Sequence, residues 1–197
     1  MKIAICTPVH GDTKAAYTAS LVEMLIFTLG RANPPTISYF QRSSSMLPVG
    51  RCDLVDAALR DGADYILWVD SDHSFPPDTL IRLLAHNVDV VALNFRRRLP
   101  PHDVVAYDLE GRAMVSGTGL VKASNVGLGL CLMRTSVFKD ITPPLFEFRI
   151  DRHGMITGED AVLFGKILQA GFDIHVDMTL SAQCGHIAEK TLTLDCA

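Results

Sequence analysis

The sequence has no long hydrophobic run, since no segment reaches the roughly 18 uninterrupted apolar residues that a membrane-spanning helix needs. It also has no positively charged leader followed by an apolar stretch, because the chain from Met1 to Ile5 runs directly into a strand pattern. We therefore expect no membrane span and no secretory signal, and we expect a cytoplasmic protein.

Cysteine is scarce and scattered. The five cysteines are odd in number and include no C-x-x-C pair, so they indicate neither a disulfide framework nor a thiolate zinc site. A reducing compartment fits this usage best. The cysteines are Cys6, Cys52, Cys131, Cys184 and Cys196.

An excess of basic residues is absent as well. The chain has 18 Lys and Arg against 22 Asp and Glu, a net charge of −4, and so lacks the broad basic face on which duplex binding depends. The single basic run, Arg96 to Arg98, is too short to reverse this balance. It is either a solvated loop after a strand or a clamp for phosphate or for an anionic acceptor.

The sequence does have the composition of a globular domain. Its 197 residues are 48% hydrophobic and 20% charged, and a chain of this length buries roughly 70% of its unfolded surface. We therefore expect a single domain, 1–197, that needs neither disulfides nor a structural metal. Any bound metal is then expected to serve chemistry.

Short apolar runs alternate with segments of helical periodicity through the first half of the chain. Continuous apolar strands indicate a sheet covered on both faces, so the alternation predicts an α/β fold with a mostly parallel central sheet and helices on both faces. Ligands in such a fold bind beyond the carboxyl ends of the strands. The predicted strands are 3–7, 36–40, 65–69 and 88–93, with helices between about 17 and 30, between 50 and 62, and from Pro76 to about 84.

From about residue 100 the pattern predicts a small antiparallel addition. Segments 104–107 and 113–115 flank Glu110-Gly111 as a hairpin, and 127–133 is a further apolar strand. A helix over 158–170 and a strand at 174–176 then precede a loop that holds His186.

Two carboxylates, Asp70 and Asp72, directly follow the apolar run from Ile66 to Val69. In extended backbone this spacing places both side chains on one face, at the end of the sheet where ligands bind. There they can hold one divalent cation that neutralises a diphosphate leaving group. A D-x-D is also common in surface turns, but carboxylates at the end of a buried strand need compensation, which favours the functional interpretation.

Glu159 and Asp160 at a helix start, with His186 in a later loop, form a second candidate group. Each has an ordinary alternative, since acidic residues cap helices and a lone histidine is often buried and hydrogen-bonded. Together with Asp70 and Asp72 they would supply a carboxylate that takes a proton from an acceptor hydroxyl and a nitrogen ligand for a metal.

Several short segments stand in a recognisable order along the chain. They are Ile5 to Val9, Gly50 to Val55, Asp70-Ser71-Asp72, Gly158-Glu159-Asp160 and Gly185-His186. This order resembles that of family 2-like glycosyltransferases with the Rossmann-like GT-A fold, in particular their short phage and bacterial forms. The resemblance covers nearly the whole chain and is most specific over 51–98. It implies a nucleotide-binding half, 1–99, an acceptor and catalytic half, 100–197, and a location in the host cytoplasm for a phage-encoded member.

The resemblance also implies a metal-dependent, inverting transfer of a sugar from a UDP- or GDP-sugar to an acceptor hydroxyl. The acceptor itself stays open between a glycan, a protein, a small metabolite and a modified nucleic-acid base. Asp160, beside Glu159, would be the catalytic base. Mn²⁺ suits a mixed carboxylate and imidazole ligand set better than Mg²⁺. The implied nucleotide-sugar contacts are Thr7, Pro8, Val9, Arg51, Asp70 and Ser71, and the implied metal ligands are Asp70, Asp72 and His186.

The sequence departs from the pattern of that family at some points. His73 follows the D-x-D where a hydrophobic residue is usual, and it is either a further metal ligand, a residue that supports a ligand, or a solvent-facing one. The Q-x-x-R-W signature of processive synthases is absent, so we expect no polymerisation. Gly127 and Gly129 lack the third glycine of a dinucleotide fingerprint; they form either a tight strand or a floor that lets a sugar approach the backbone.

Two other functions use a similar fold. A nucleotidyltransferase would place a glycine-rich basic loop after the first strand to cradle a triphosphate, and Pro8 to Asp12 is not such a loop. A noncatalytic nucleotide- or glycan-binding module would lose Asp160 or the D-x-D, and both are present. The sequence therefore favours a glycosyltransferase over either alternative.

Overall fold

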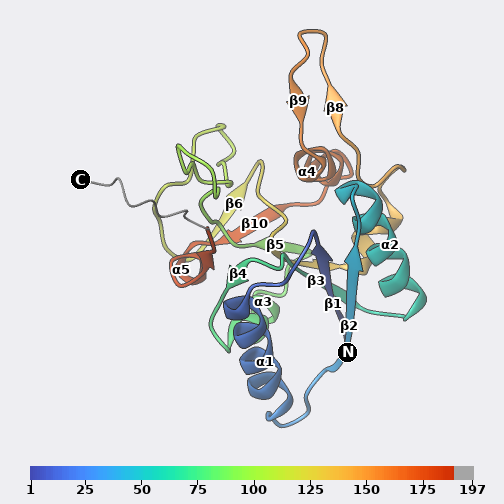
Figure 1. Cartoon of the computed structure of the whole chain (residues 1–197), viewed down its shortest axis with the longest axis vertical. Helices are drawn as coiled ribbons and strands as arrows, with labels where there is room; N and C mark the ends of the chain where they lie inside the picture. Colours follow the sequence, from blue (N-terminus) through green and yellow to red (C-terminus); the bar gives the residue numbers. More distant parts are fainter. Residues whose placement is uncertain (189–197) are drawn as a thin grey trace.

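One seven-stranded sheet organises residues 1–188, the part of the chain that the computed structural model describes (Figure 1). Its strands are β1 (Lys2–Val9), β2 (Thr36–Ser43), β3 (Tyr65–Val69), β5 (Val90–Ala92), β6 (Leu120–Ala123), β7 (Leu130–Arg134) and β10 (Ile174–Asp177), in the spatial order β2-β1-β3-β7-β5-β10-β6. β1 pairs in parallel with β2 and β3, and β5 with β10. β7 runs antiparallel to β3 and β5, and β6 antiparallel to β10. The predicted mostly parallel sheet with a small antiparallel addition is confirmed.

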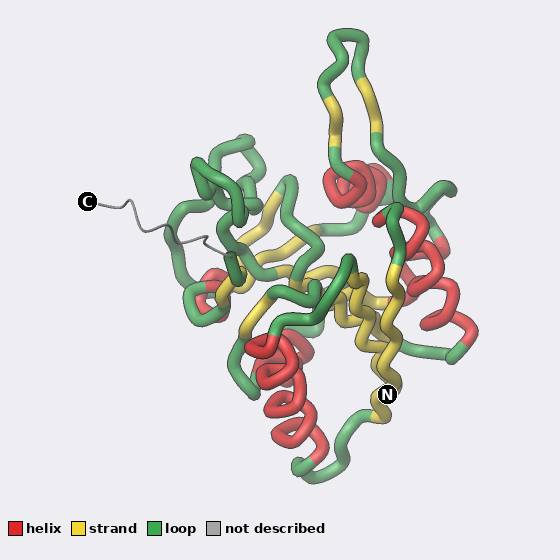
Figure 2. The backbone as a smooth tube through the Cα atoms, in the orientation of Figure 1, coloured by secondary structure: helices red, strands yellow, loops and turns green. Residues whose placement is uncertain are grey.

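Helices cover both faces of this sheet (Figure 2). They are α1 (Ala15–Leu29), α2 (Leu47–Arg60), α3 (Thr79–Ala85), α4 (Glu159–Gln169) and α5 (Met178–Ser181), with a 3₁₀ helix at Thr135–Lys139. Because successive strand residues point to opposite faces, Ile3 and Ile5 join the core cluster of α1, α3 and α5. Ala4 and Cys6 join the cluster of α2 and α4. The predicted helices on both faces are therefore confirmed.

Two element boundaries next to prolines differ from the prediction. β1 continues through Pro8 to Val9, because its pairing with β3 ends at Cys6 and a proline is tolerated where a strand has only one neighbour. α3 begins at Thr79 rather than Pro76. Pro76 precedes another proline, and that position is held out of the helical region.

The region after residue 100 contains less regular structure than predicted. Segments 104–107 and 113–115 form no strands; one isolated bridge joins Tyr107 to Ala113 around the Glu110-Gly111 turn. A hairpin that the sequence analysis missed, β8 (Arg149–Ile150) with β9 (Ile156–Thr157), projects beyond α4 (Figure 1).

A second small sheet joins two distant parts of the chain. β4 (His73–Ser74) pairs antiparallel with β11 (Gly185–His186), and His186 lies opposite His73. This pairing draws the segment that holds His186 to the carboxyl end of β3. The expected loop around His186 is thus a short strand.

The described helices and cysteines can be compared with the expectations of no membrane span and no disulfide framework. Among residues 1–188, no helix combines the length and the apolar character that crossing a membrane requires. Cys6, Cys52, Cys131 and Cys184 are free thiols, and Cys196 lies outside the described residues.

Candidate active site

The chain turns immediately after β3. The Asp70 N–H donates to the Gly129 carbonyl at 2.8 Å, and the His73 N–H donates to the Asp70 carbonyl at 3.2 Å. The backbone is therefore not extended here, so strand alternation does not place the carboxylates of Asp70 and Asp72 on one face as expected. Each carboxylate has its own set of neighbours.

Asp72 is the centre of a cluster of ionisable groups. Its Oδ2 lies 2.9 Å from Nη1 of Arg98 and 3.4 Å from Nε2 of His186, and its Oδ1 lies 3.3 Å from Nδ1 of His73. One ligand atom from each of Asp72, His73 and His186 lies within 4.8 Å of the others. The structure thus brings together the predicted pair Asp72 and His186, and adds His73 and Arg98.

The orientation of His186 is fixed from two sides. The pairing of β4 with β11 stacks its ring on that of His73, with centroids 4.5 Å apart and ring planes 16° apart. Its Nδ1 lies 2.8 Å from the Arg96 carbonyl oxygen. Because a carbonyl only accepts, Nδ1 carries the hydrogen and Nε2 faces Asp72, which is the arrangement that metal-binding histidines use.

The charges of Asp72 and His186 depend on one another. Burial opposes ionisation of Asp72, but the close contacts and charge interactions with His186 and His73 hold the pKa of Asp72 well below its usual range. Burial also disfavours the charged form of His186, yet the contacts with Asp72 and with the Arg96 carbonyl raise the pKa of His186 above its usual value of 6.5. The metal-free cluster therefore contains an ionised Asp72 and a His186 that stays protonated to higher pH than an ordinary histidine.

His73 belongs to the interior of the site. It is 1% exposed, and within residues 1–188 neither of its ring nitrogens has a hydrogen-bond partner. Its ring packs edge-on against Phe95, with centroids 4.4 Å apart. A solvent-facing role for His73 is therefore wrong, although its position directly after the D-x-D was the signal that could have placed it here.

Two glycines make room for these rings. A Cβ at Gly129 would lie 2.6 Å from Cε1 of His73, and a Cβ at Gly127 would lie 2.7 Å from Cζ of Phe95. The space above both glycines is thus filled by protein side chains. Of the two alternatives for these glycines, the floor for a sugar is wrong, because His73 and Phe95 occupy that space.

Asp70 belongs to a different network, centred on Arg51. Arg51 is 3% exposed, and its Nη2 lies 3.3 Å from Oδ1 of Asp70 while its Nε lies 3.4 Å from Oε1 of Glu159. Its guanidinium also lies over the Trp68 ring, 5.6 Å from the centroid. Arg51 therefore ties α2 to the end of β3 and to the start of α4.

Glu159 and Asp160, the predicted catalytic pair, have different surroundings. Glu159 is 7% exposed, and burial raises its pKa while the nearby Arg51 opposes the rise. Asp160 is half-buried, and its Oδ1 accepts a hydrogen bond from the Ala161 N–H at 2.7 Å. Of the two carboxylates, Asp160 is the more accessible.

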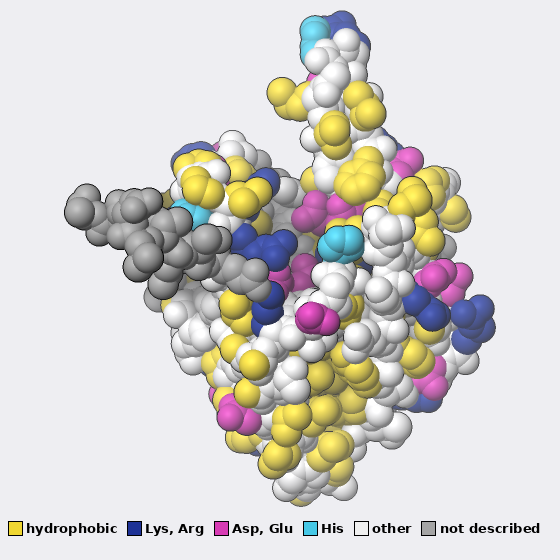
Figure 3. Space-filling view, viewed as in Figure 1, with side chains coloured by type: hydrophobic (Ala, Val, Ile, Leu, Met, Phe, Trp, Pro, Cys, Tyr) yellow, Lys and Arg dark blue, Asp and Glu magenta, His cyan; other side chains and the backbone are white. Residues whose placement is uncertain are grey.

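A cavity of about 510 Å³ opens beyond the carboxyl ends of β1 and β3. Of the predicted nucleotide contacts, Pro8, Val9, Asp70 and Ser71 line it, together with Asp72 and Arg98. Thr7 is fully buried beneath it and its hydroxyl lies 2.7 Å from that of Tyr17, while Arg51 lies behind Asp70. In Figure 3 Lys and Arg side chains gather next to acidic ones in the hollow of this face.

Comparison with known proteins agrees with the fold. No protein-family model and no curated protein sequence matches the chain. The fold is similar to that of A197 from STIV, with a TM-score of 0.63 and 13% identity over 98% of this chain and 97% of A197. It is also similar to that of S. aureus TarS (residues 1–349), solved in complex with UDP-GlcNAc, with a TM-score of 0.56 and 16% identity over 100% of this chain and 61% of that one. The chain has a GT-A fold.

Within this GT-A fold, the group of Asp72, His73 and His186 suits a divalent cation. A carboxylate with two imidazoles is a donor set that Mn²⁺ and similar ions accept. The ring nitrogens of His73, which make no hydrogen bond within residues 1–188, and the carbonyl-bound Nδ1 of His186 fit such a role. Asp70, expected as a ligand, lies against Arg51 and outside this group.

Proposed function

We propose that this chain is a glycosyltransferase that moves a sugar from a UDP- or GDP-sugar to an acceptor hydroxyl with inversion. The proposal depends above all on one observation: Asp72 lines the cavity beyond β1 and β3, and ligand atoms of His73 and His186 lie within 4.8 Å of its carboxylate. The likeness to TarS, solved with UDP-GlcNAc, supports a nucleotide sugar as donor. Residues 1–99 would make most of the contacts to the nucleotide, and the acceptor would lie mainly against residues after 100.

The donor would lie in the 510 Å³ cavity, with Pro8 and Val9 beside the nucleotide and Asp70 and Ser71 near the ribose. Arg51 would act through Asp70, which it holds at the cavity wall, rather than through direct contact with the nucleotide. This is consistent with its burial behind that wall.

Asp72, His73 and His186 would hold Mn²⁺ or Mg²⁺, which would supply positive charge to the diphosphate leaving group. Arg98 lines the same cavity and pairs with Asp72, so its guanidinium can add charge-assisted hydrogen bonds to diphosphate oxygens.

In the transfer, the acceptor oxygen bonds to the anomeric carbon as the bond from that carbon to the diphosphate breaks. The acceptor proton passes to a carboxylate, and the nucleoside diphosphate leaves with the bonding electron pair. We assign the base to Asp160, since it is the accessible member of the acidic pair. Glu159 is buried against Arg51 and positions the start of α4.

The test compares Asp160→Asn with Asp173→Asn, a control on an exposed aspartate between α4 and β10. Calorimetry with UDP- and GDP-sugars in Mn²⁺ measures donor binding, and release of the nucleoside diphosphate measures transfer. We expect Asp160→Asn to bind the donor normally and to lose transfer by about 10² to 10⁴-fold. Absence of nucleotide-sugar binding refutes the function, and near wild-type transfer by Asp160→Asn, or retention at the anomeric carbon, refutes the base assignment.

A further inference from the structure

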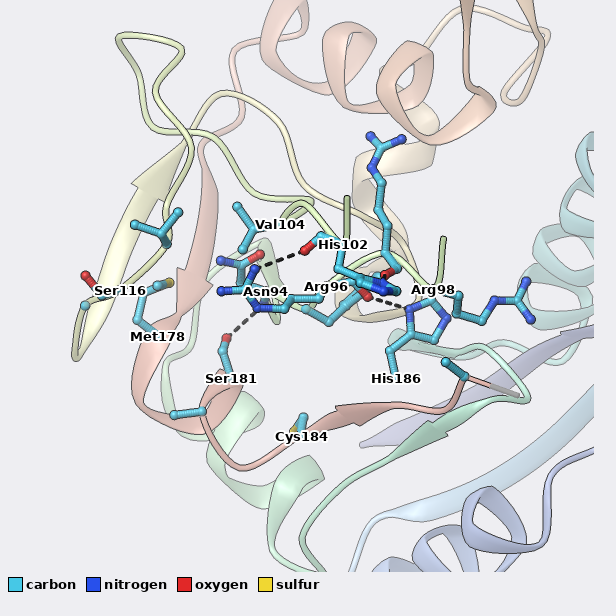
Figure 4. Close-up of a pocket in the computed structure, with 16 residues that line it drawn as sticks. Asn94, Arg96, Arg98, His102, Val104, Ser116, Met178, Ser181, Cys184 and His186 are labelled. Atoms are coloured by element: carbon cyan, nitrogen blue, oxygen red, sulfur yellow. Dashed lines mark hydrogen bonds between the residues drawn. The ribbon is translucent and has the colours of Figure 1, made fainter. Parts of the chain in front are cut away.

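A second cavity, of about 460 Å³, lies next to the Asp72 cluster and is lined by His186 of that cluster (Figure 4). It is bounded by the loop that follows β5, by residues 115–117 and by the segment from α5 to β11. Arg98 lines both cavities, and His186, which contacts Asp72, lines this one. A ligand here would face a donor across Asp72 and His186.

The walls of the second cavity are held together by one buried side chain. Asn94 is 6% exposed, and its amide donates to the Met114 carbonyl at 2.6 Å and accepts from the Ala106 N–H at 3.1 Å. Its backbone N–H donates to Oγ of Ser181 at 2.8 Å. Asn94 thus connects β5, the 104–115 loop and α5, so the cavity is a built feature of the fold and not a gap between mobile loops.

The second cavity is basic in an acidic protein. Its described lining includes three arginines, Arg96 to Arg98, and the histidines His102 and His186, but no Asp or Glu, although the chain has a net charge of −4. Such a grouping of one sign of charge creates a potential that attracts anions.

The three arginines differ in what their guanidinium groups contact. Arg98 is paired with Asp72, and Arg96 donates from Nη1 to the His102 carbonyl at 3.0 Å, which braces the loop. The exposed Arg97 side chain has no acidic partner within residues 1–188. Arg97 therefore offers a planar guanidinium to a ligand, with the geometry that suits phosphate and carboxylate groups.

The cavity also has an apolar side. Phe95, Val104 and Met178 line it, and the last two are buried. A purely inorganic anion would leave this side unused, whereas a molecule with an apolar portion next to its anionic group would contact both sides.

We propose that this second cavity binds the acceptor, and that the acceptor carries a phosphate or carboxylate group held by Arg97 beside an apolar portion. That the ligand is an acceptor rests on the proposed function. That the cavity binds an anion does not depend on it. It makes a neutral glycan the wrong acceptor class for this enzyme. Arg96 and His102 shape the loop that presents Arg97.

The test uses three probes of similar size: 4-nitrophenyl phosphate, 4-nitrobenzoate and the neutral 4-nitrobenzyl alcohol. Calorimetry on the full chain measures their binding to the wild type, to Arg97→Gln and to Arg152→Gln, a control on an exposed arginine in the β8–β9 turn. We expect one or both anions to bind, the alcohol to bind at least about tenfold more weakly, and Arg97→Gln alone to weaken the anions about tenfold. The tighter anion identifies the group.

Titration of the same proteins with UDP and Mn²⁺ separates the two proposals. If UDP binds and the anions do not, or if Arg97→Gln leaves anion binding unchanged, the inference is overturned while the proposed function stands. If the anions bind through Arg97 and no nucleoside diphosphate binds, the anion site stands and the proposed function falls. We expect Arg97→Gln to leave UDP binding unchanged, because Arg97 does not line the donor cavity.

Discussion

Replacing Gly129 by alanine tests the packing on which the candidate metal group depends. The added Cβ would lie 2.6 Å from Cε1 and 3.0 Å from Nε2 of His73, and 2.9 Å from Cζ of Phe95. Neither ring can retreat easily, because His73 lies between His186, on which it stacks, and Phe95, which it meets edge-on, at centroid distances of 4.5 and 4.4 Å. The imidazole must therefore move away from its place beside Asp72.

The magnitude follows from two opposing effects. Overpacking a tight core lowers the free energy of unfolding by about 1–3 kcal/mol. Replacing glycine restricts the unfolded chain, which raises the free energy of unfolding by about 0.4–1 kcal/mol. At the midpoints of these ranges the net loss is about 1.3 kcal/mol, or about 3–5 °C in Tm for a domain of this size. Displacement of His73 should also weaken Mn²⁺ binding.

Thermal unfolding and Mn²⁺ calorimetry measure the two effects. Gly165→Ala is the matched control, because this glycine lies inside α4 and a Cβ there would meet nothing within 4 Å. We expect Gly165→Ala to stabilise the protein by about 0.5–1 kcal/mol without changing Mn²⁺ affinity. If Gly129→Ala raised Tm as much as Gly165→Ala does, the described packing of His73 would be incorrect.

Three further predictions concern the charged groups. Arg98→Gln removes the guanidinium that lies 2.9 Å from Asp72, so we expect Mn²⁺ to bind about fivefold more tightly by calorimetry; weaker binding would contradict this. Arg51→Met leaves the buried Glu159 without its partner, so urea unfolding should show a loss of about 3 kcal/mol or more, and adding Glu159→Gln should recover part of it. The raised pKa of His186 contributes stability that is present below the unfolded pKa of about 6.5 and is lost as pH rises through the folded value. Metal-free protein should therefore lose more Tm between pH 6 and pH 8.5 than His186→Asn does, and equal losses would refute the assignment.

The sequence was sufficient where local pattern decides structure. β3 was predicted with correct bounds because Tyr65 to Val69 are all apolar and all five are buried. Helices on both faces followed from the same continuous apolar strands, since a strand buried on both sides needs cover on both sides. The prediction that Asp72 and His186 lie together also agrees with the structure, and whether they bind a metal stays a prediction.

The sequence was insufficient where distant segments meet. His73 and His186 are 113 positions apart (186 − 73), and no local signal indicates that β4 and β11 pair, although that pairing builds the cluster. The partners of Arg51 come from β3 and α4, so its burial could not be read from α2 alone. The turn at Asp70 also depends on a hydrogen bond to Gly129, which lies far along the chain.

The position of β7 determines when the sheet can be completed during synthesis. β7 lies between β3 and β5, yet it begins 61 positions after β3 ends (130 − 69). Until those residues leave the ribosome, β3 has an open, fully apolar edge, and such an edge can pair with other chains. Assembly of the sheet therefore waits for late, non-local pairing, which slows folding and prolongs exposure of that edge. A nascent chain stopped before residue 130 should consequently be a chaperone substrate rather than a folded half-domain.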